Sequence, residues 1–202
     1  MGEVIQAKVA ILGAGPAGTA AAAHLGTLGV SDVVLVDRHD FPRDKTCGSG
    51  ISPKGIETLK ELGVWHEIEP HSYWIKGIRI VTPGGYDSWQ SAGDVGAAVV
   101  CHRRTLDHIL LKRAVARGTR FVPNFNATEA IEEGGRVAGF RSADGREVRA
   151  QWTMIAGGSH CRIGLPEQRR NHPDVRRGRD RNEFRQSLHE TKQGGEPKRH
   201  RE

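Results

Sequence analysis

Cysteine is scarce in this chain of 202 residues. Its three cysteines, Cys47, Cys101 and Cys161, lie far apart and form neither a Cys-x-x-Cys pair nor the Cys/His spacing of a zinc site. This pattern excludes a disulfide-rich scaffold, and we expect no metal site. An odd number of cysteines without a signal peptide fits a reducing compartment, so we predict a cytoplasmic protein.

The chain also lacks an uninterrupted apolar run of membrane-spanning length. The segment 9–30 is apolar enough to resemble one, but it contains five glycines, a proline and His24. A membrane span is therefore a poor interpretation of this segment. The positions of its glycines favour the nucleotide-binding interpretation given below.

Acidic residues are outnumbered, with 24 Asp plus Glu against 30 Lys plus Arg and a formal net charge of +6. Residues 1–161 carry 18 basic and 17 acidic residues, whereas residues 162–202 carry 12 and 7. The basic excess therefore belongs to the C-terminal segment. That segment has too few apolar residues to form a core, so we expect a disordered basic tail at 162–202 after one domain at 1–161.

Aromatic residues make up 5% of the chain, and the tail contains only Phe184 for stacking on bases. We therefore expect no nucleic-acid partner, although the arginines of the tail would suit one. A solvated extension and a non-native reading frame are the other two interpretations of the tail. We hypothesise a frameshift or truncation near Ile163, because apolar content and the motifs described below end there together.

The first forty residues contain a strand, a glycine-rich turn, a helix and a second strand in succession. The strand at 8–12 is aliphatic, and residues 13–18 read Gly-Ala-Gly-Pro-Ala-Gly. An alanine-rich helix is predicted at 19–28 and a second strand at 33–36. Asp37 then follows the last glycine of the turn by 19 residues, close to the spacing of about 20 seen in dinucleotide-binding units.

Each part of this motif has a chemical purpose in nucleotide binding. Gly13 permits the tight turn, Gly15 lets a pyrophosphate approach the backbone, and Gly18 permits close packing of helix on strand. The helix N-terminus offers N–H groups and a positive dipole end to phosphates. Asp37 can accept hydrogen bonds from a ribose diol and disfavours a 2′-phosphate. The motif alone does not separate NAD from FAD, and a chance glycine turn is the structural alternative.

Residues 42–53 read Pro-Arg-Asp-Lys-Thr-Cys-Gly-Ser-Gly-Ile-Ser-Pro. This segment resembles the loop Pro-Arg-x-Lys-x-Cys-Gly-x-Gly-x-x-Pro of the geranylgeranyl reductase family. Members are FAD-dependent reductases of isoprenoid double bonds, related to aromatic hydroxylases and flavin halogenases. Residues 56–65 are similar to the helix that follows this loop in the family.

Two further segments carry the resemblance. Residues 103–110 are similar to the family segment Arg-x-x-Phe/Leu-Asp-x-x-Leu, whose arginine lies beside the FAD in relatives. Residues 154–163 match a third motif only in part, with Gly157 at its aspartate position and Gly158 at its glycine position. The family's later Gly-Asp motif is expected farther downstream than this chain extends.

The glycine motif and the resemblance together imply an FAD site. The predicted cofactor-binding residues are Gly13, Gly15, Pro16, Ala17, Gly18, Asp37, Arg38, Cys47, Gly48, Arg103 and Gly158. The resemblance places Cys47 near the flavin ring, where it is the candidate catalytic residue, shaping the pocket or donating a proton. Composition alone favours a small buried hydrophobe at this position.

The predicted fold is α/β, a three-layer FAD-type Rossmann domain. A helix is expected at 106–116 and a strand at 120–123, followed by a β-meander within 127–155. The segment 71–100 shows loosely alternating apolar residues and a Pro-Gly-Gly turn. We interpret it as the start of an inserted substrate-domain sheet, as the resemblance implies.

The resemblance implies a reductase of isoprenoid C=C bonds that uses hydride from reduced FAD. NADPH would be a transient electron donor, since no second glycine motif is present. An isoprenoid or other small molecule would be the substrate, and peripheral contact with a membrane stays open, as does the oligomeric state. Two alternatives also stay open: a relative of the aromatic monooxygenases, and a catalytically inactive FAD-binding fragment.

Overall fold

The computed structural model describes residues 2–159, 161 and 163. The chain divides into two units, Met1–Gly164 and Leu165–Glu202. The predictions for the tail at 162–202, namely its disorder and its altered reading frame, lie outside the described residues apart from Ile163. In the part of the chain that is described, no helix combines the length and apolarity needed to cross a bilayer.

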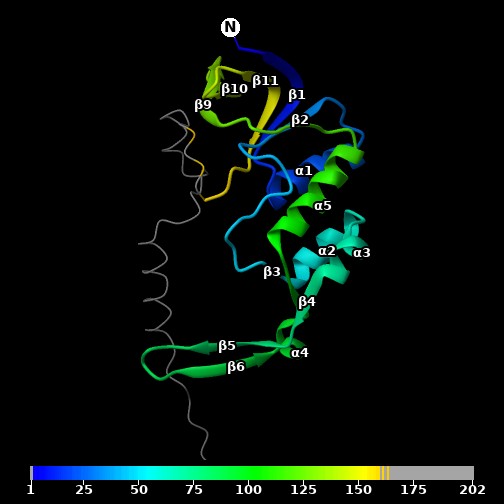
Figure 1. Cartoon of the computed structure of the whole chain (residues 1–202), viewed down its shortest axis with the longest axis vertical. Coiled ribbons are helices and arrows are strands. Elements are labelled where there is room, and N and C mark those ends of the chain that lie inside the picture. Colours follow the sequence, from blue (N-terminus) through cyan, green and yellow to red (C-terminus); the bar gives the residue numbers. More distant parts are fainter. Residues whose placement is uncertain (1, 160, 162, 164–202) are drawn as a thin grey trace, which may run out of the picture. The chain divides into compact units, whose positions relative to one another are not determined.

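A six-stranded sheet forms the centre of the first unit (Figure 1). In spatial order its strands are β8 (Arg120–Val122), β2 (Val33–Val36), β1 (Val4–Leu12), β11 (Glu147–Ile155), β10 (Arg136–Ser142) and β9 (Ala127–Glu133). β1 runs parallel to both β2 and β11, and β2 runs parallel to β8. β9, β10 and β11 form the antiparallel meander.

Two helices cover one face of this sheet. α1 (Pro16–Thr27) and α5 (Arg103–Ala116) pack against each other. Ile11 of β1 and Leu35 of β2 are fully buried in the apolar cluster under these helices. Because side chains alternate along a strand, the intervening residues of β1 and β2 point to the other face.

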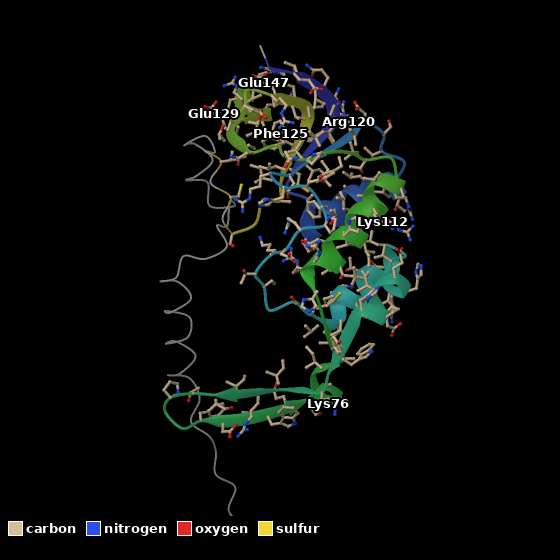
Figure 2. All side chains as sticks on the ribbon, in the orientation of Figure 1. Lys76, Lys112, Arg120, Phe125, Glu129 and Glu147 are labelled. Atoms are coloured by element: carbon tan, nitrogen blue, oxygen red, sulfur yellow. The ribbon has the colours of Figure 1, made fainter. Side chains whose placement is uncertain are left out.

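On the opposite face, side chains from the meander and from the segment before it pack with those of β1 and β2. Ala10 and Val34 belong to a second apolar cluster there, together with Phe140 of β10 and Phe125 (labelled in Figure 2). Both phenylalanines are fully buried. Helices therefore cover one face of a parallel-rich sheet, a second apolar cluster lies on its other face, and the predicted α/β FAD-type fold is confirmed.

Arg141 of β10 connects the three strands of the meander on its exposed side. Its Nη1 lies 2.7 Å from Oε2 of Glu129 on β9, and its Nε lies 2.9 Å from Oε1 of Glu147 on β11. Figure 2 labels both glutamates near the end of the sheet. Arg141 lies directly opposite both glutamates in the strand register, and ion pairs near the surface contribute little to stability.

A smaller helical and β region is inserted in the sequence between β2 and α5. Its helical part consists of α2 (Pro53–Glu61), α3 (Trp65–Ile68) and the 3₁₀ helix η1 (Glu69–His71). The strands β3 (Gly50–Ile51), β7 (Ala98–Cys101) and β4 (Ser72–Ile75) form an antiparallel sheet in that spatial order.

A separate hairpin follows β4. It consists of β5 (Gly77–Val81) and β6 (Asp87–Ser91), with the short helix α4 (Ala92–Val95) after it (Figure 1). The side chains of Ile78 and Trp89 are 51% and 59% exposed. These strands fall within the 71–100 segment of the predicted inserted sheet, and their membership of a substrate domain stays a prediction.

Several element boundaries differ from the sequence-based ones. α1 begins at Pro16 rather than residue 19, because a proline fits the first helical turn, where no N–H bond is required. α5 begins at Arg103 rather than residue 106. β1 begins at Val4 rather than residue 8, because its first half gains a partner in β11, with Val4 opposite Glu147.

Candidate functional site

The turn between β1 and α1 needs its three glycines for different reasons. Gly13 has a φ of +101°, and Gly18 approaches the turn so closely that a Cβ there would lie 1.9 Å from the Gly13 carbonyl oxygen. Gly15 has a φ of −74°, which any residue can adopt. A Cβ at Gly15 would meet only Arg103 Nη2 at 3.7 Å and Arg43 Nη2 at 4.0 Å. The backbone at Gly15 therefore faces a space that two guanidinium groups border.

The N-terminus of α1 is free to receive an anion at this space. Gly15 precedes the helix without a side-chain cap, and the first turn contains no acidic residue. The amides of Ala17 and Gly18 precede the first intrahelical bond, which Thr19 N donates to Gly15 O at 3.0 Å. Pro16 and Ala17 thus begin a helix whose positive dipole end and free N–H groups suit a phosphate.

Asp37 lies beside the same turn at the end of β2. Its Oδ2 accepts a hydrogen bond from Ala14 N at 2.8 Å, and its Oδ1 accepts one from His39 N at 2.9 Å. The residue is 7% exposed. Since a carboxylate oxygen can accept more than one bond, Asp37 retains acceptor capacity for a ribose hydroxyl. Arg38, the next residue, is exposed and donates to the His39 ring at 3.1 Å.

A buried carboxylate holds the two arginines that border Gly15. Asp107 has no exposed surface, and its two oxygens accept bonds from Arg103 Nε and Nη2, both at 2.7 Å. Arg43 Nη2 lies 3.3 Å from Asp107 Oδ2, and the Arg43 guanidinium lies 4.8 Å from the centre of the Phe41 ring. We call Arg43, Arg103 and Asp107 the Asp107 cluster. It carries a net charge of +1.

The cluster explains why an arginine can occupy the first turn of α5. A positive side chain is unfavourable at a helix N-terminus, where a bound phosphate would compensate for it. The structure provides a nearer compensation, because Asp107 one turn later pairs with Arg103 at i and i+4. The hydrogen bonds that Arg103 donates to Asp107 raise the pKa of Arg103 above its ordinary value.

Cys47 lies in the loop 44–49, which approaches the same arginine. Its thiol is exposed, and hydrogen bonding by the Ser49 backbone and then by Arg103 lowers the pKa of Cys47. The loop and the start of α5 line an open cavity of about 460 Å³. Its lining consists of Asp44, Lys45, Thr46, Cys47, Gly48, Ser49, Val100, His102, Arg103 and Arg104. Cys47 and Gly48 thus line an accessible hollow together with Arg103.

The segment that follows β11 lies near the same loop, at Lys45. Gly158 has a φ of +76°, and a Cβ there would lie 3.7 Å from Lys45 Nζ. Gly157 occupies the position of the family's aspartate, and a Cβ there would lie 2.6 Å from Cys161 Sγ. A side chain at this position would therefore require Cys161 to move.

The structure brings most of the predicted site residues together. Gly15, Cys47, Gly48 and Arg103 lie around one region, Asp37 supports the glycine turn, and Gly158 lies near Lys45. Their roles toward a cofactor stay predictions. Among the described residues, no group of three or more His, Cys, Asp and Glu could hold a metal ion.

Sequence reasoning missed three residues of this region: Arg43, Lys45 and Asp107. All three belong to motifs that carry the family resemblance, but no role was assigned to them. The spacing of four between Arg103 and Asp107 is a signal for a helical ion pair. The contact of Asp107 with Arg43 joins positions 64 residues apart, which no local pattern reveals.

Residues 6–176 match the sequence family described as FAD binding domain. The chain belongs to this family. It is 33% identical over 174 residues to a menaquinone reductase of Mycobacterium tuberculosis, an alignment covering 84% of this chain and 42% of the relative. It is 31% identical over 170 residues to digeranylgeranylglycerophospholipid reductase 1 of Methanothermobacter thermautotrophicus, covering 79% and 41%. The predicted relationship to geranylgeranyl reductases is confirmed.

Solved structures support the same relationship. A geranylgeranyl bacteriochlorophyll reductase-like protein from Thermoplasma acidophilum has a TM-score of 0.63 and 26% identity, covering 77% of this chain and 40% of that one. A myxobacterial chondrochloren halogenase, described as FAD-dependent, has a TM-score of 0.66 and 22% identity, covering 79% and 39%. The second likeness shows the fold alone. The chain spans about two fifths of the length of the curated relatives it matches.

FAD fits the residues that the FAD binding domain presents here. Gly15 leaves space for a pyrophosphate, the α1 amides and two guanidinium groups surround that space, and Asp37 retains acceptor capacity beside it. These groups match a dinucleotide with anionic phosphates and a ribose diol.

Proposed function

We propose that this chain is the nucleotide-binding part of an FAD-dependent oxidoreductase that reduces isoprenoid C=C bonds. The observation that carries the proposal is the open backbone at Gly15, bordered by Arg43 and Arg103 and by the N-terminus of α1. The names of the relatives, a menaquinone reductase and a digeranylgeranylglycerophospholipid reductase, support a reductase of isoprenoid compounds.

Each residue has a defined task in this proposal. The amides of Ala17 and Gly18 and the guanidinium groups of Arg43 and Arg103 would bind the pyrophosphate. Asp37 would accept hydrogen bonds from the adenosine ribose. FAD, when bound, would supply the hydride chemistry of the reaction.

Cys47 is the residue we propose as the proton donor or as part of the ring pocket. Its exposed thiol lines the cavity that also contains Gly48 and Arg103. A lowered thiol pKa makes proton release easier, which is the property that an acid near neutral pH needs. Cys47 is the one cysteine among the residues that line this cavity.

The remaining parts of the proposal concern partners. NADPH is the proposed electron donor, bound transiently. The substrate is an isoprenoid lipid or quinone, so peripheral contact of a cytoplasmic protein with a membrane surface is part of the same proposal.

The proposed reaction can be tested on the purified chain. It is loaded with FAD, reduced by dithionite without oxygen, and incubated in separate samples with menaquinone and with a geranylgeranyl lipid. After any quinol is reoxidised in air, mass spectrometry of the lipid detects the gain of two hydrogen atoms per reduced double bond of the isoprenoid chain. Such a gain, dependent on FAD and on the protein, is the expected result.

Two other outcomes separate the alternatives. A product that contains an added oxygen atom, formed only when oxygen is admitted, indicates a monooxygenase. Binding of FAD without any product indicates a nucleotide-binding chain that lacks turnover. Either outcome contradicts the reductase proposal for this chain, and both leave FAD binding intact.

A further inference from the structure

The Asp107 cluster has a geometry that goes beyond a structural ion pair. Arg103 and Arg43 come from different parts of the chain, yet the Nη2 atom of each faces both Asp107 Oδ2 and the space at Gly15. The distances are 2.7 and 3.3 Å to the carboxylate oxygen, and 3.7 and 4.0 Å to the position of a Gly15 Cβ. One carboxylate oxygen therefore determines where both Nη2 groups lie relative to the glycine turn.

The hydrogen-bonding capacity of the two arginines is not exhausted by Asp107. A guanidinium group has five N–H donors, and Asp107 uses two of those on Arg103. Arg43 Nε is buried and finds no hydrogen-bond partner among the described residues. The side chains of both arginines are only 12% exposed, so solvent has limited access to them. The cluster is thus fixed in place with donors left for an anion.

We propose that Asp107 is a positioning residue for the flavin nucleotide site, which fixes Arg43 and Arg103 toward the glycine turn and toward Cys47. The inference rests on the proposed FAD site and assigns a task to a residue that would not touch the cofactor. A positioning role and a purely electrostatic role of Asp107 predict opposite changes in FAD affinity when its charge is removed. Removing the negative charge of Asp107 raises the local positive charge, which by itself would strengthen binding of an anion.

The thiol of Cys47 provides a second readout that needs no cofactor. Arg103 lowers the pKa of Cys47, whereas the negative charge of Asp107 raises it. If Asp107 acted only through its charge, its removal would lower the pKa of the thiol further. If Asp107 holds Arg103 in place, its removal frees Arg103 and raises the pKa of the thiol.

The experiment compares Asp107→Asn with the native chain and with Asp87→Asn. The control removes the same charge from an exposed ion pair with Arg79 in the β5–β6 hairpin. Circular dichroism checks the fold of each protein. FAD affinity is measured by quenching of flavin fluorescence, and alkylation of Cys47 by iodoacetamide is followed against pH by peptide mass spectrometry.

For Asp107→Asn we expect FAD to bind about tenfold more weakly, since charge-assisted hydrogen bonds to phosphate are misaligned. We also expect the inflection of Cys47 alkylation to move to higher pH. Asp87→Asn should change neither. FAD affinity that is equal or higher in Asp107→Asn, or an alkylation inflection that stays or moves to lower pH, overturns the inference.

Two further arms separate this inference from the proposed function. If the native chain does not bind FAD, the proposed function fails, and the Cys47 readout alone decides the role of Asp107. If Asp107→Asn does not fold, Asp107→Glu replaces it, because glutamate keeps the negative charge but moves the carboxylate by one methylene group. Weaker FAD binding and a higher alkylation inflection in Asp107→Glu support positioning by Asp107, and native values for either overturn it.

Discussion

The glycine turn shows how three identical residues acquire different physical roles. Gly13 must be a glycine because its φ is left-handed. Gly18 must be a glycine because the helix lies directly against the turn and leaves no space for a Cβ. Gly15 has an ordinary backbone conformation and open space beside it. A glycine that the fold does not require, placed beside two arginines, indicates that something else approaches the backbone there.

The first prediction follows from this contrast. Gly15→Val should leave the fold intact, because its φ suits any residue and an extended ψ is favoured before proline. FAD affinity should fall by on the order of 100-fold, because the added side chain fills the space of the pyrophosphate. Circular dichroism and flavin fluorescence quenching measure the two properties. Unchanged FAD affinity in the folded variant would remove Gly15 from the site.

Gly18→Ala is the matched comparison for that variant. Its new methyl group would lie 1.9 Å from a backbone oxygen, so helix α1 would have to move away from the turn. We therefore expect a loss of thermal stability as well as of FAD binding. A melting temperature equal to that of the native chain would contradict the close packing at Gly18.

A second prediction at the residue scale concerns the thiols. Cys47 should be alkylated at lower pH than an ordinary thiol, because the Ser49 backbone and Arg103 stabilise its thiolate. Burial raises the pKa of Cys101, which should remain unmodified in the folded chain. Iodoacetamide labelling across a pH series, read by peptide mass spectrometry, measures both. Equal labelling of the two cysteines at neutral pH is the contradicting result.

At the scale of elements, helix α2 depends on a local cap. Ser52 precedes the helix with an extended backbone, and its Oγ accepts a hydrogen bond from Gly55 N at 3.2 Å. Pro53 then occupies the first helical turn, where its missing N–H costs nothing. The helix packs Ile56 and Leu59 into the core beneath α5.

The cap makes a prediction for stability. Ser52→Ala should lower the free energy of unfolding by about 1 kcal/mol, the usual cost of losing a serine cap. Ser31→Ala, in an exposed loop, is the control and should change it far less. Urea unfolding followed by circular dichroism measures both. Equal midpoints for the two variants would show that the Ser52 hydroxyl does not stabilise α2.

The elements themselves could largely be predicted from the sequence, because their signals are local. Alternating or continuous apolar residues predict β1, β2 and the meander, and Gly134 and Gly145 lie at the turns between its strands. The first half of β1 escaped prediction, because its strand partner, β11, lies more than 140 residues away. The same reason applies to the Asp107 cluster, whose contact with Arg43 exists only in the folded chain.

At the scale of the whole molecule, exposed apolar side chains are concentrated in two regions of the described chain. Tyr73, Tyr86 and Trp89 lie on or beside the strands of the 71–100 segment, and Trp152 and Met154 lie on β11. The chain spans about two fifths of the length of its curated relatives, so the matching parts of those proteins continue beyond the aligned region. The phosphate-binding groups named in the proposed site all lie in this unit.

The central claim is that this unit binds FAD, and the visible spectrum of the purified chain tests it most directly. The chain is incubated with excess FAD, separated from free flavin by gel filtration, and measured between the near ultraviolet and the visible range. We predict a flavin spectrum shifted from that of free FAD, at close to one FAD per chain. A colourless protein fraction, with all FAD eluting as free flavin, would contradict the account.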